Sequence, residues 1–284
     1  MAMEISRRTF IKGTAAAGVV LMSGAYLGCG GKNIPEQVRR GDVTYDVLVI
    51  GSGGAGMRAG LAAAQNKDLK VAVLTKLVPT RSASTMAQGG MNGVTGVTDP
   101  NDSIESHTFD TIKGGDYLCD QDAVEYFAEN AGKTIFEMDY MGYPYNRQKD
   151  GHFHQRKMGG SSYPRAAYFE DRAGHAMVHA LFEQCLAHNI DFISECQMLE
   201  ISMTDAGKLA GIVAMDMRSG DLIGIPAKTV LIATGGYGRA YWVRTSNPYS
   251  STGDGIVAGM NAGIPFKDPE MVQFHPTGLS VNGV

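Results

Sequence analysis

The sequence predicts an α/β fold that opens with a Rossmann-like dinucleotide-binding unit. Three observations carry this prediction: a buried-strand run, a glycine-rich loop directly after it, and a helix that leads to a second strand. These elements occupy Tyr45–Ile50, Gly51–Gly56, Met57–Asn66 and Lys70–Leu74. The GxGxxG spacing alone is a weak signal in a glycine-rich chain. The strand before it and the helix after it provide the context in which this motif indicates dinucleotide binding.

The loop Gly51-Ser52-Gly53-Gly54-Ala55-Gly56 has the residue types that phosphate binding needs. Gly51 permits a tight turn, Gly53 admits a pyrophosphate, and Gly56 lets the helix pack on the strand. The N-terminus of the helix then faces the phosphates. The second strand ends in Leu74-Thr75-Lys76, where a standard NAD-dependent dehydrogenase carries an acidic residue for the ribose. This departure argues against a nicotinamide dehydrogenase.

Residues 1–30 are expected to be a twin-arginine signal peptide. The motif Ser6-Arg7-Arg8-Thr9-Phe10-Ile11-Lys12 is followed by a weakly hydrophobic stretch, Gly13–Gly28, that is short for a membrane span. Cys29 lies in a poor lipobox, which leaves a lipid anchor open. Residues 31–43 are expected to be a linker, and the folded domain is expected to begin at residue 44.

The rest of the chain continues the α/β pattern. Apolar residues at helical spacing predict two helices, alternating segments predict a β-hairpin, and a short apolar run predicts a strand before a second glycine loop. The expected ranges are 121–140 and 172–188 for the helices, 191–203 with 209–217 for the hairpin, Thr229–Ala233 for the strand and Thr234–Gly238 for the loop. Glycine-rich loops at 79–98 and an irregular stretch at 141–170 separate these elements.

Composition narrows the function classes. With 284 residues and 44% hydrophobic content, the chain can bury a sizeable core. A net charge of −4 gives no indication of nucleic-acid binding. The four cysteines form no CxxC or CxxCH pattern, so the sequence predicts no metal site, iron–sulfur cluster or c-type haem within this chain. Whether any cysteines pair is left open.

Three further segments are ambiguous on their residues alone. The run Arg81–Gly90 offers hydroxyls and backbone amides that suit a pyrophosphate or a flavin ring, but it is equally a Ser/Gly loop. Asp254, between two glycines, serves either a ligand or a turn. Proline after His275 holds that histidine in extended backbone, and a single histidine is more often structural than a ligand.

Taken together, the motifs resemble the flavoprotein subunit of succinate dehydrogenase and fumarate reductase, almost continuously over residues 45–284. The order and spacing of the motifs make this resemblance specific. They are Gly51–Gly56, Thr75-Lys76, Pro79-Thr80-Arg81-Ser82, Gln88-Gly89-Gly90, Gln155-Arg156 with Gly159-Gly160, Asp171-Arg172-Ala173-Gly174-His175, Ala233-Thr234-Gly235-Gly236, Thr252-Gly253-Asp254-Gly255 and Phe274-His275-Pro276-Thr277-Gly278.

The resemblance implies a Rossmann-like FAD-binding domain of this type over residues 44–284. The residues that would contact FAD are Gly51, Ser52, Gly53, Gly54, Ala55, Gly56, Thr75, Lys76, Ser82, Ala83, Ser84, Thr85, Gln88, Gly89, Gly90, Ala233, Thr234, Gly235 and Asp254. Gln88, Gly89 and His275 would face a dicarboxylate, fumarate or succinate. His275 would hold one carboxylate by a charge-assisted hydrogen bond.

Three departures from the family pattern matter. Ala83 stands where many members carry the His that bonds covalently to the flavin, so FAD is expected to be non-covalent, which would favour fumarate reduction. Met158 replaces a Phe that packs on the substrate. The family's capping domain, Thr-Glu substrate contacts and proton-donating arginine lie beyond Val284, so the chain is expected to be an N-terminal fragment that is inactive alone.

The function expected from the resemblance is a fumarate reductase flavoprotein subunit, working by hydride transfer from FAD. Electrons would come from a quinol through an iron–sulfur subunit and a membrane-linked quinol-oxidising subunit. The export signal favours a periplasmic enzyme of the methylmenaquinol type. Four alternatives stay open: succinate dehydrogenase, L-aspartate oxidase, a reductase of another unsaturated acid, and a flavin-binding or interaction module without turnover.

Overall fold

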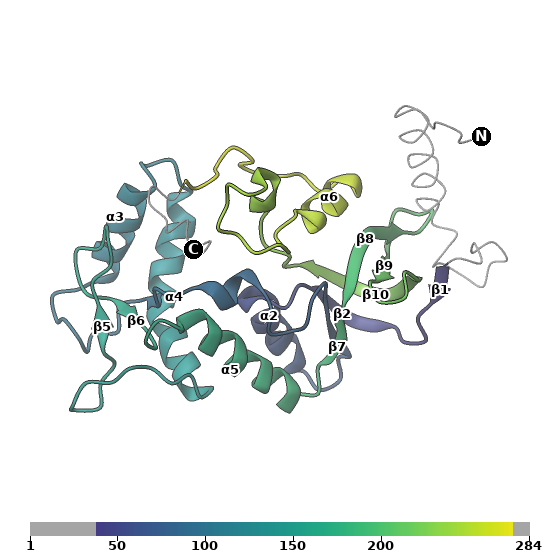
Figure 1. The fold of residues 1–284 in the computed structure, drawn as a ribbon. Coiled ribbons are helices and arrows are strands. Elements are labelled where there is room, and N and C mark those ends of the chain that lie inside the picture. The colour runs from purple at the N-terminus through teal and green to yellow at the C-terminus, as the bar shows by residue number, and fades with distance from the viewer. Residues whose placement is uncertain (1–37, 275–284) are drawn as a thin grey trace. The chain divides into compact units, whose positions relative to one another are not determined.

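The computed structural model describes residues 38–274, and these divide into two compact units (Figure 1). One unit contains the chain up to Pro79 and again from His188, and we call it the sheet unit. The other contains Thr80–Ala187, and we call it the inserted unit because it interrupts the first in sequence.

The sheet unit is built on a seven-stranded mixed sheet. Its main path runs in the order β7-β3-β2-β10-β9-β8, and β1 pairs with β10. The strands are β1 (Val38–Arg40), β2 (Tyr45–Ile50), β3 (Val71–Thr75), β7 (Asp191–Ser194), β8 (Cys196–Met203), β9 (Leu209–Asp216) and β10 (Leu222–Ile232). The helices are α2 (Gly54–Ala64), the 3-10 helix η3 (Gly238–Tyr241) and α6 (Asp254–Asn261).

The core of the unit is formed by buried residues of both the parallel and the antiparallel strands. All five residues of β3 are buried, as expected for a strand covered on both faces. The long strand β10, seen in Figure 1, changes partner midway. Its first half pairs antiparallel with β9, and from Ala227 it pairs parallel with β2. Its second half therefore brings the following loop to the carboxyl end of β2.

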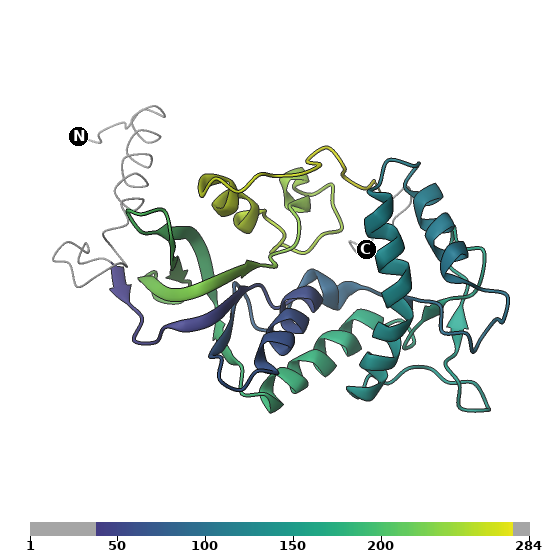
Figure 2. The ribbon, with the colours of Figure 1, turned by 180° about the vertical axis from the view of Figure 1, so that it is seen from behind.

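The inserted unit combines helices with a small three-stranded sheet in the order β4-β6-β5. Its elements are the 3-10 helix η2 (Ala83–Met86), β4 (Met91–Asn92), α3 (Ile104–Gly114), α4 (Gln121–Tyr140), β5 (Gln155–Arg156), β6 (Ala166–Ala167) and α5 (Ala173–Ala187). The side chains of Ser103 and Asp120 cap the first turns of α3 and α4. These two helices lie side by side in both views (Figure 2).

Several sequence predictions are confirmed and others need correction. The strand Tyr45–Ile50 and the helix over 121–140 have the expected bounds, and the second long helix differs by one residue at each end. The helix expected from Met57 already starts at Gly54. The segment 191–203 is two strands: β7 pairs with β3, and only β8 forms the hairpin with β9. The backbone turns at Glu195, where φ is +56°.

Other elements start earlier than expected or were not predicted. The strand expected over Thr229–Ala233 begins at Leu222, β1 lies within the expected linker, and the small sheet occupies loops expected to be irregular. Helices α3 and α6 were not predicted either. Within residues 38–274, no helix is both long and apolar enough to cross a membrane. The twin-arginine motif, Cys29 and His275 lie outside the described residues.

Candidate flavin site

The loop after β2 has no room for side chains at two of its glycines. Gly51 adopts φ +112°, and a Cβ there would lie 2.3 Å from the carbonyl oxygen of Ala233. A Cβ at Gly56 would lie 1.9 Å from the carbonyl oxygen of Gly51. Both distances are far below van der Waals contact, so only glycine permits this turn and this approach of helix to strand.

Helix α2 begins inside the loop, at Gly54. Gly53 precedes the helix in an extended conformation, and no side chain caps the first turn. No acidic residue lies in that turn. The positive end of the helix dipole, at a first turn without a side-chain cap, therefore suits a pyrophosphate.

The residues expected at the ends of the neighbouring strands join this loop. The Ser52 hydroxyl donates to Thr75 Oγ1 over 3.0 Å, and both side chains are buried. The amide of Gly51 donates to the carbonyl of Leu74, and the amide of Ala233 donates to the carbonyl of Ile50. The carboxyl ends of β2, β3 and β10 thus meet at one edge of the sheet, the usual ligand edge of such folds.

The glycine after Asp254 allows α6 to approach this edge. A Cβ at Gly255 would lie 2.1 Å from Thr234 Oγ1, so the first turn of α6 packs directly on the loop after β10. Gly253 caps the helix in a left-handed conformation, with φ +79°. Asp254 is therefore the first residue of a helix rather than part of a simple turn.

Lys76 and Asp254 form an ion pair within the sheet unit. Lys76 Nζ contacts Asp254 Oδ2 and donates to Thr252 Oγ1 over 2.6 Å, and the Thr252 hydroxyl donates to Asp254 Oδ2 over 2.9 Å. Both charged side chains keep about a quarter of their surface exposed, at 21% and 28%. They can therefore exchange this contact for hydroxyl groups of a ribose at little cost, because partly exposed ion pairs are weak.

The segment Ser82–Thr85 forms a tight turn in the inserted unit. Thr85 Oγ1 donates to the carbonyl of Thr80 over 3.0 Å and lies near the Ser82 amide and hydroxyl. Ala83 is exposed at the start of η2. Gly174, in the first turn of α5, touches this turn so closely that a Cβ would lie 1.9 Å from the Ser84 carbonyl oxygen.

Gln88, Gly89 and Gly90 follow this turn, and one residue that the sequence did not assign as a site holds them. The Arg156 guanidinium donates to the carbonyl oxygens of both Gln88 and Gly89. Gly90 has φ +115°, and a Cβ there would lie 2.6 Å from the Ala167 carbonyl oxygen. Gln155-Arg156 was one of the motifs of the family resemblance, but its contacts with Gln88 and Gly89 span 67 and 68 residues of sequence.

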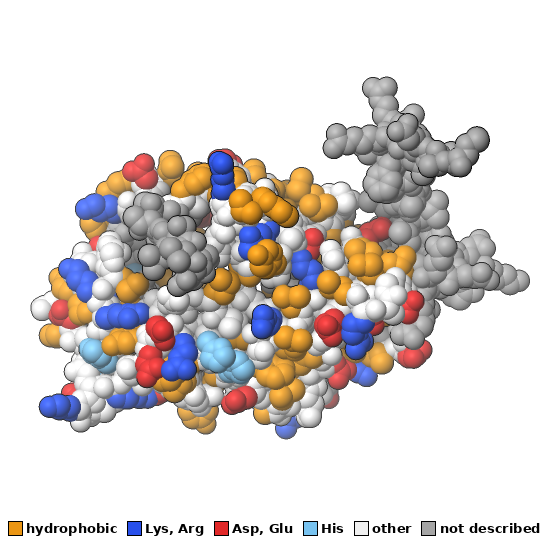
Figure 3. Space-filling view, in the orientation of Figure 1, with side chains coloured by type: hydrophobic (Ala, Val, Ile, Leu, Met, Phe, Trp, Pro, Cys, Tyr) orange, Lys and Arg blue, Asp and Glu red, His pale blue; other side chains and the backbone are white. Residues whose placement is uncertain are grey.

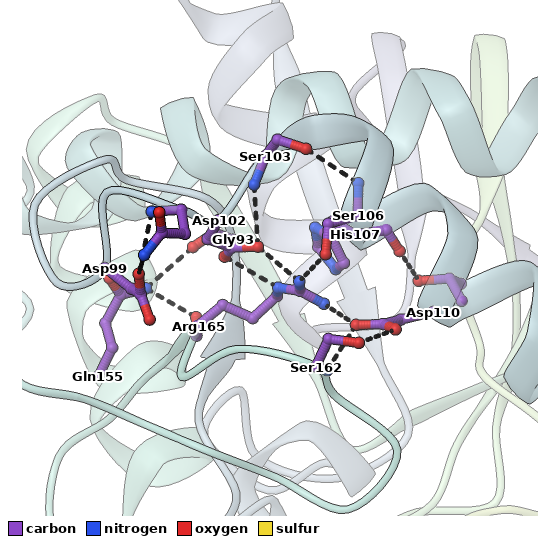
Figure 4. Close-up of polar contacts among 12 residues, drawn as sticks. Gly93, Asp99, Asp102, Ser103, Ser106, His107, Asp110, Gln155, Ser162 and Arg165 are labelled. Atoms are coloured by element: carbon purple, nitrogen blue, oxygen red, sulfur yellow. Dashed lines mark hydrogen bonds and ion pairs between the residues drawn. The ribbon is translucent and has the colours of Figure 1, made fainter.

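A buried ionic cluster supports the same unit (Figure 4). The side chain of Arg165 is only 1% exposed and lies between Asp102 and Asp110. Arg165 Nε and Nη2 donate to the two oxygens of Asp102, and Nη1 donates to Asp110 Oδ2 over 2.6 Å. The Ser162 amide and hydroxyl also donate to Asp110. This cluster ties the loop before β6 to α3.

The charges of the cluster are mutually stabilised. Burial alone would raise the pKa of Asp110, but the hydrogen bonds from Ser162 and Arg165 outweigh it and lower that pKa. Burial likewise opposes the charge of Arg165, yet its two carboxylate partners raise the pKa of the guanidinium. Burial and the nearby Arg165 charge lower the pKa of His107, whose buried Nδ1 has no partner among the described residues.

The structure thus brings together the expected sites within each unit. In the sheet unit, Gly51–Gly56, Thr75, Lys76, Ala233–Gly235 and Asp254 share one edge, and their cradle fits a dinucleotide. In the inserted unit, Ser82–Gly90 forms one continuous segment. No group of three or more potential metal ligands occurs among the residues described. On the face in Figure 3, basic and acidic side chains are mixed rather than gathered.

Comparisons with known proteins agree with this geometry. The FAD binding domain family matches residues 46–283, and the twin-arginine translocation signal family matches residues 4–24. The 8-methylmenaquinol:fumarate reductase flavoprotein subunit of Wolinella succinogenes is 44% identical, over 100% of this chain and 46% of its own length. The succinate dehydrogenase flavoprotein subunit of Coxiella burnetii is 41% identical, over 83% of this chain and 41% of its own length.

Solved structures give the same picture. A mutant Escherichia coli quinol fumarate reductase FrdA has a TM-score of 0.79 and 38% identity, covering 85% of this chain and 40% of that one. A quinol-fumarate reductase with menaquinol molecules also has a TM-score of 0.79, with 39% identity, covering 85% of this chain and 41% of that one. The chain therefore spans less than half the length of these relatives.

Proposed function

The chain belongs to the FAD binding domain family, in the group of fumarate reductase and succinate dehydrogenase flavoprotein subunits, and we propose that it serves fumarate reduction. The observation that supports this direction most is the 44% identity to a methylmenaquinol:fumarate reductase subunit over the whole chain. The FAD site belongs to the chain itself, whereas the reaction is proposed for the whole protein.

In this proposal the sheet unit holds the pyrophosphate and the ribose of FAD. The amides at the start of α2 bind the phosphates, Gly51 and Gly56 give them access, and Lys76 with Asp254 binds hydroxyl groups. FAD supplies two-electron chemistry when bound. Ala83 offers no nucleophile at the start of η2, so these contacts hold FAD without a covalent bond.

Gln88, Gly89 and His275 are proposed to face the dicarboxylate. Gln88 and Gly89 offer an amide side chain and backbone N–H groups, and a protonated His275 binds one carboxylate. Met158 lies beside Gly89, because a Cβ on that glycine would be 3.2 Å from Met158 Cε. Its thioether side chain is proposed to pack on the substrate and exclude water.

The proposed partners follow from the names of the relatives, which are subunits of larger enzymes. We propose an iron–sulfur subunit that receives electrons from a membrane-linked, quinol-oxidising subunit. The match to a twin-arginine signal supports export of the folded, FAD-loaded protein to the periplasm. Association with the membrane would occur through these partners.

The native subunit, isolated with its partners, tests the direction. We expect the isolated enzyme to reduce fumarate with a reduced quinol analogue faster than it oxidises succinate with the oxidised analogue. Succinate dehydrogenase is the second candidate, because relatives with that name are 41% identical to the chain. Faster succinate oxidation would favour that candidate, and the absence of both activities with FAD bound would reject the pair.

A further inference from the structure

Along residues 87–90, the backbone carbonyl oxygens and the backbone amide groups differ in their hydrogen bonding. Its carbonyl oxygens are held by the protein: the Gly174 amide donates to Ala87 over 2.7 Å, and Arg156 donates to Gln88 and Gly89 over 2.8–3.2 Å. Within residues 38–274, no hydrogen bond is found from the amide N–H groups of Gln88, Gly89 or Gly90. Among the described residues, three consecutive N–H donors thus have no hydrogen-bond partner, whereas the carbonyl oxygens of residues 87–89 are hydrogen-bonded.

We propose that Arg156 is the positioning residue that orients two of these amides, those of Gly89 and Gly90, toward a ligand. A guanidinium that donates to two successive carbonyls fixes two successive peptide planes, since the N–H of each plane lies opposite its C=O. The amides of Gly89 and Gly90 belong to those planes. The proposal rests on the function proposed above, in which this segment lies at the flavin and the substrate.

Arg156 is itself held in place by further contacts within the inserted unit. Its guanidinium carbon lies 4.2 Å from the centroid of the Tyr168 ring, in cation–π geometry. The Tyr168 hydroxyl in turn hydrogen-bonds with His154 Nδ1 over 2.9 Å. Gln155, the neighbour of Arg156 in β5, is buried and bonds to the carbonyls of Gly93 and Arg165. The guanidinium therefore has little freedom to leave the segment.

The ligand group that fits is an acceptor edge with negative charge or lone pairs. Consecutive backbone N–H groups stabilise negative charge on such an edge. The effect is largest where the charge develops, as on a flavin ring that gains electrons, or is already present, as on a carboxylate. Both the flavin and the dicarboxylate have such groups. Arg156 acts on the flavin or the dicarboxylate only through the backbone of residues 88–90. The planar guanidinium, which can donate to two carbonyls at once, is needed for this role in addition to the positive charge.

The test compares Arg156→Lys with wild type in the FAD-loaded native enzyme. Lysine keeps the charge but cannot donate in a fork to two carbonyls. We expect FAD content to be unchanged. If the amides face the flavin, its midpoint potential becomes more negative; if they face the dicarboxylate, the Kd for succinate, measured by flavin difference spectra, rises about fivefold to tenfold.

Arg147→Lys is the matched control. Arg147 lies in the same unit, donates to the Gly151 carbonyl, pairs with Asp139 and stacks on Phe153, but contacts none of residues 87–90. We expect this control to leave both quantities unchanged. Should Arg156→Lys fail to fold, Tyr168→Leu removes the stacking and the hydrogen bond to His154 but keeps the Arg156 guanidinium, and it should shift the same quantity less.

The outcomes separate the two proposals. Wild-type potential and wild-type succinate affinity in Arg156→Lys would overturn the positioning role, and so would an equal effect in Arg147→Lys. A wild-type protein that takes up no FAD would instead overturn the proposed function, before any variant is compared.

Discussion

Arg165 shows how a single buried side chain organises the inserted unit. Four hydrogen bonds run from its guanidinium to two carboxylates and the Ser106 hydroxyl, so the buried charge is compensated. A buried charge of this kind is costly once a partner is removed. The cluster is therefore expected to control the stability of the unit more than any exposed ion pair.

Replacing Arg165 with Met should destabilise the protein by about 3–5 kcal/mol, because two buried carboxylates lose their partner. Urea titration followed by circular dichroism measures the change. The matched variant Arg147→Met breaks a pair with Asp139 that is 41% and 31% exposed, and it should cost less than about 1 kcal/mol. Equal losses in the two variants would show that burial is not what distinguishes them.

The same cluster predicts that the protein loses folding stability at low pH. The pKa of Asp110 is lower in the folded protein than in the unfolded chain, so its ionisation stabilises the fold above the unfolded pKa of about 3.9. That stabilisation is lost as the pH falls through the folded-state pKa. Asp110→Asn should therefore reduce the fall in stability below about pH 4, as measured by urea midpoints across pH. A wild-type slope in this variant would contradict the assignment.

At the scale of elements, the helix α2 depends on one glycine and tolerates change at another. Gly56→Ala places a methyl group 1.9 Å from the Gly51 carbonyl, so the helix must move off the strand. We expect loss of several kcal/mol and loss of FAD binding, measured by denaturation and by flavin absorbance.

Gly60, one turn later, is the control. A Cβ there would lie 3.4 Å from Val73 and 3.6 Å from Ile190, which is ordinary contact. Gly60→Ala should keep FAD and change stability by less than about 1 kcal/mol, in the stabilising direction, because alanine favours a helix. Retention of FAD by Gly56→Ala would contradict the close-packing argument.

Elements with a clear periodic pattern could be predicted from the sequence, and the others could not. The helix Gln121–Tyr140 buries a regular stripe, which its spacing reveals. Helix α3 buries only His107, so it presents no apolar stripe to detect. The break between β7 and β8 lies at Glu195, whose positive φ is imposed by the fold and is unusual for a residue with a Cβ.

The candidate site was predictable where it is local in sequence. The glycine loop and its strand form one short segment, so its chemistry could be deduced from spacing. The partners of Arg156 and Arg165 lie 55–68 residues away, and pairings of that range depend on the tertiary fold. The role proposed for His275 stays a prediction, because that residue lies outside the described part of the chain.

At the scale of the whole molecule, FAD should behave as a stabilising ligand. A ligand that binds only the folded state raises the unfolding free energy by about 2.7 kcal/mol at one hundred times its Kd. We expect a thermal midpoint that rises with FAD concentration, and hydrogen exchange that slows at the Gly51–Gly56 loop. An unchanged midpoint at saturating FAD would argue against a specific site.

Because Ala83 offers no nucleophile, acid precipitation tests both the flavin site and its non-covalent character. The FAD-loaded protein is precipitated with acid, and flavin absorbance is measured in the supernatant and in the washed pellet. We expect about one FAD per chain before precipitation and all of it in the supernatant afterwards. Yellow colour retained on the pellet would contradict binding by contacts alone, and a colourless protein would contradict the flavin site itself.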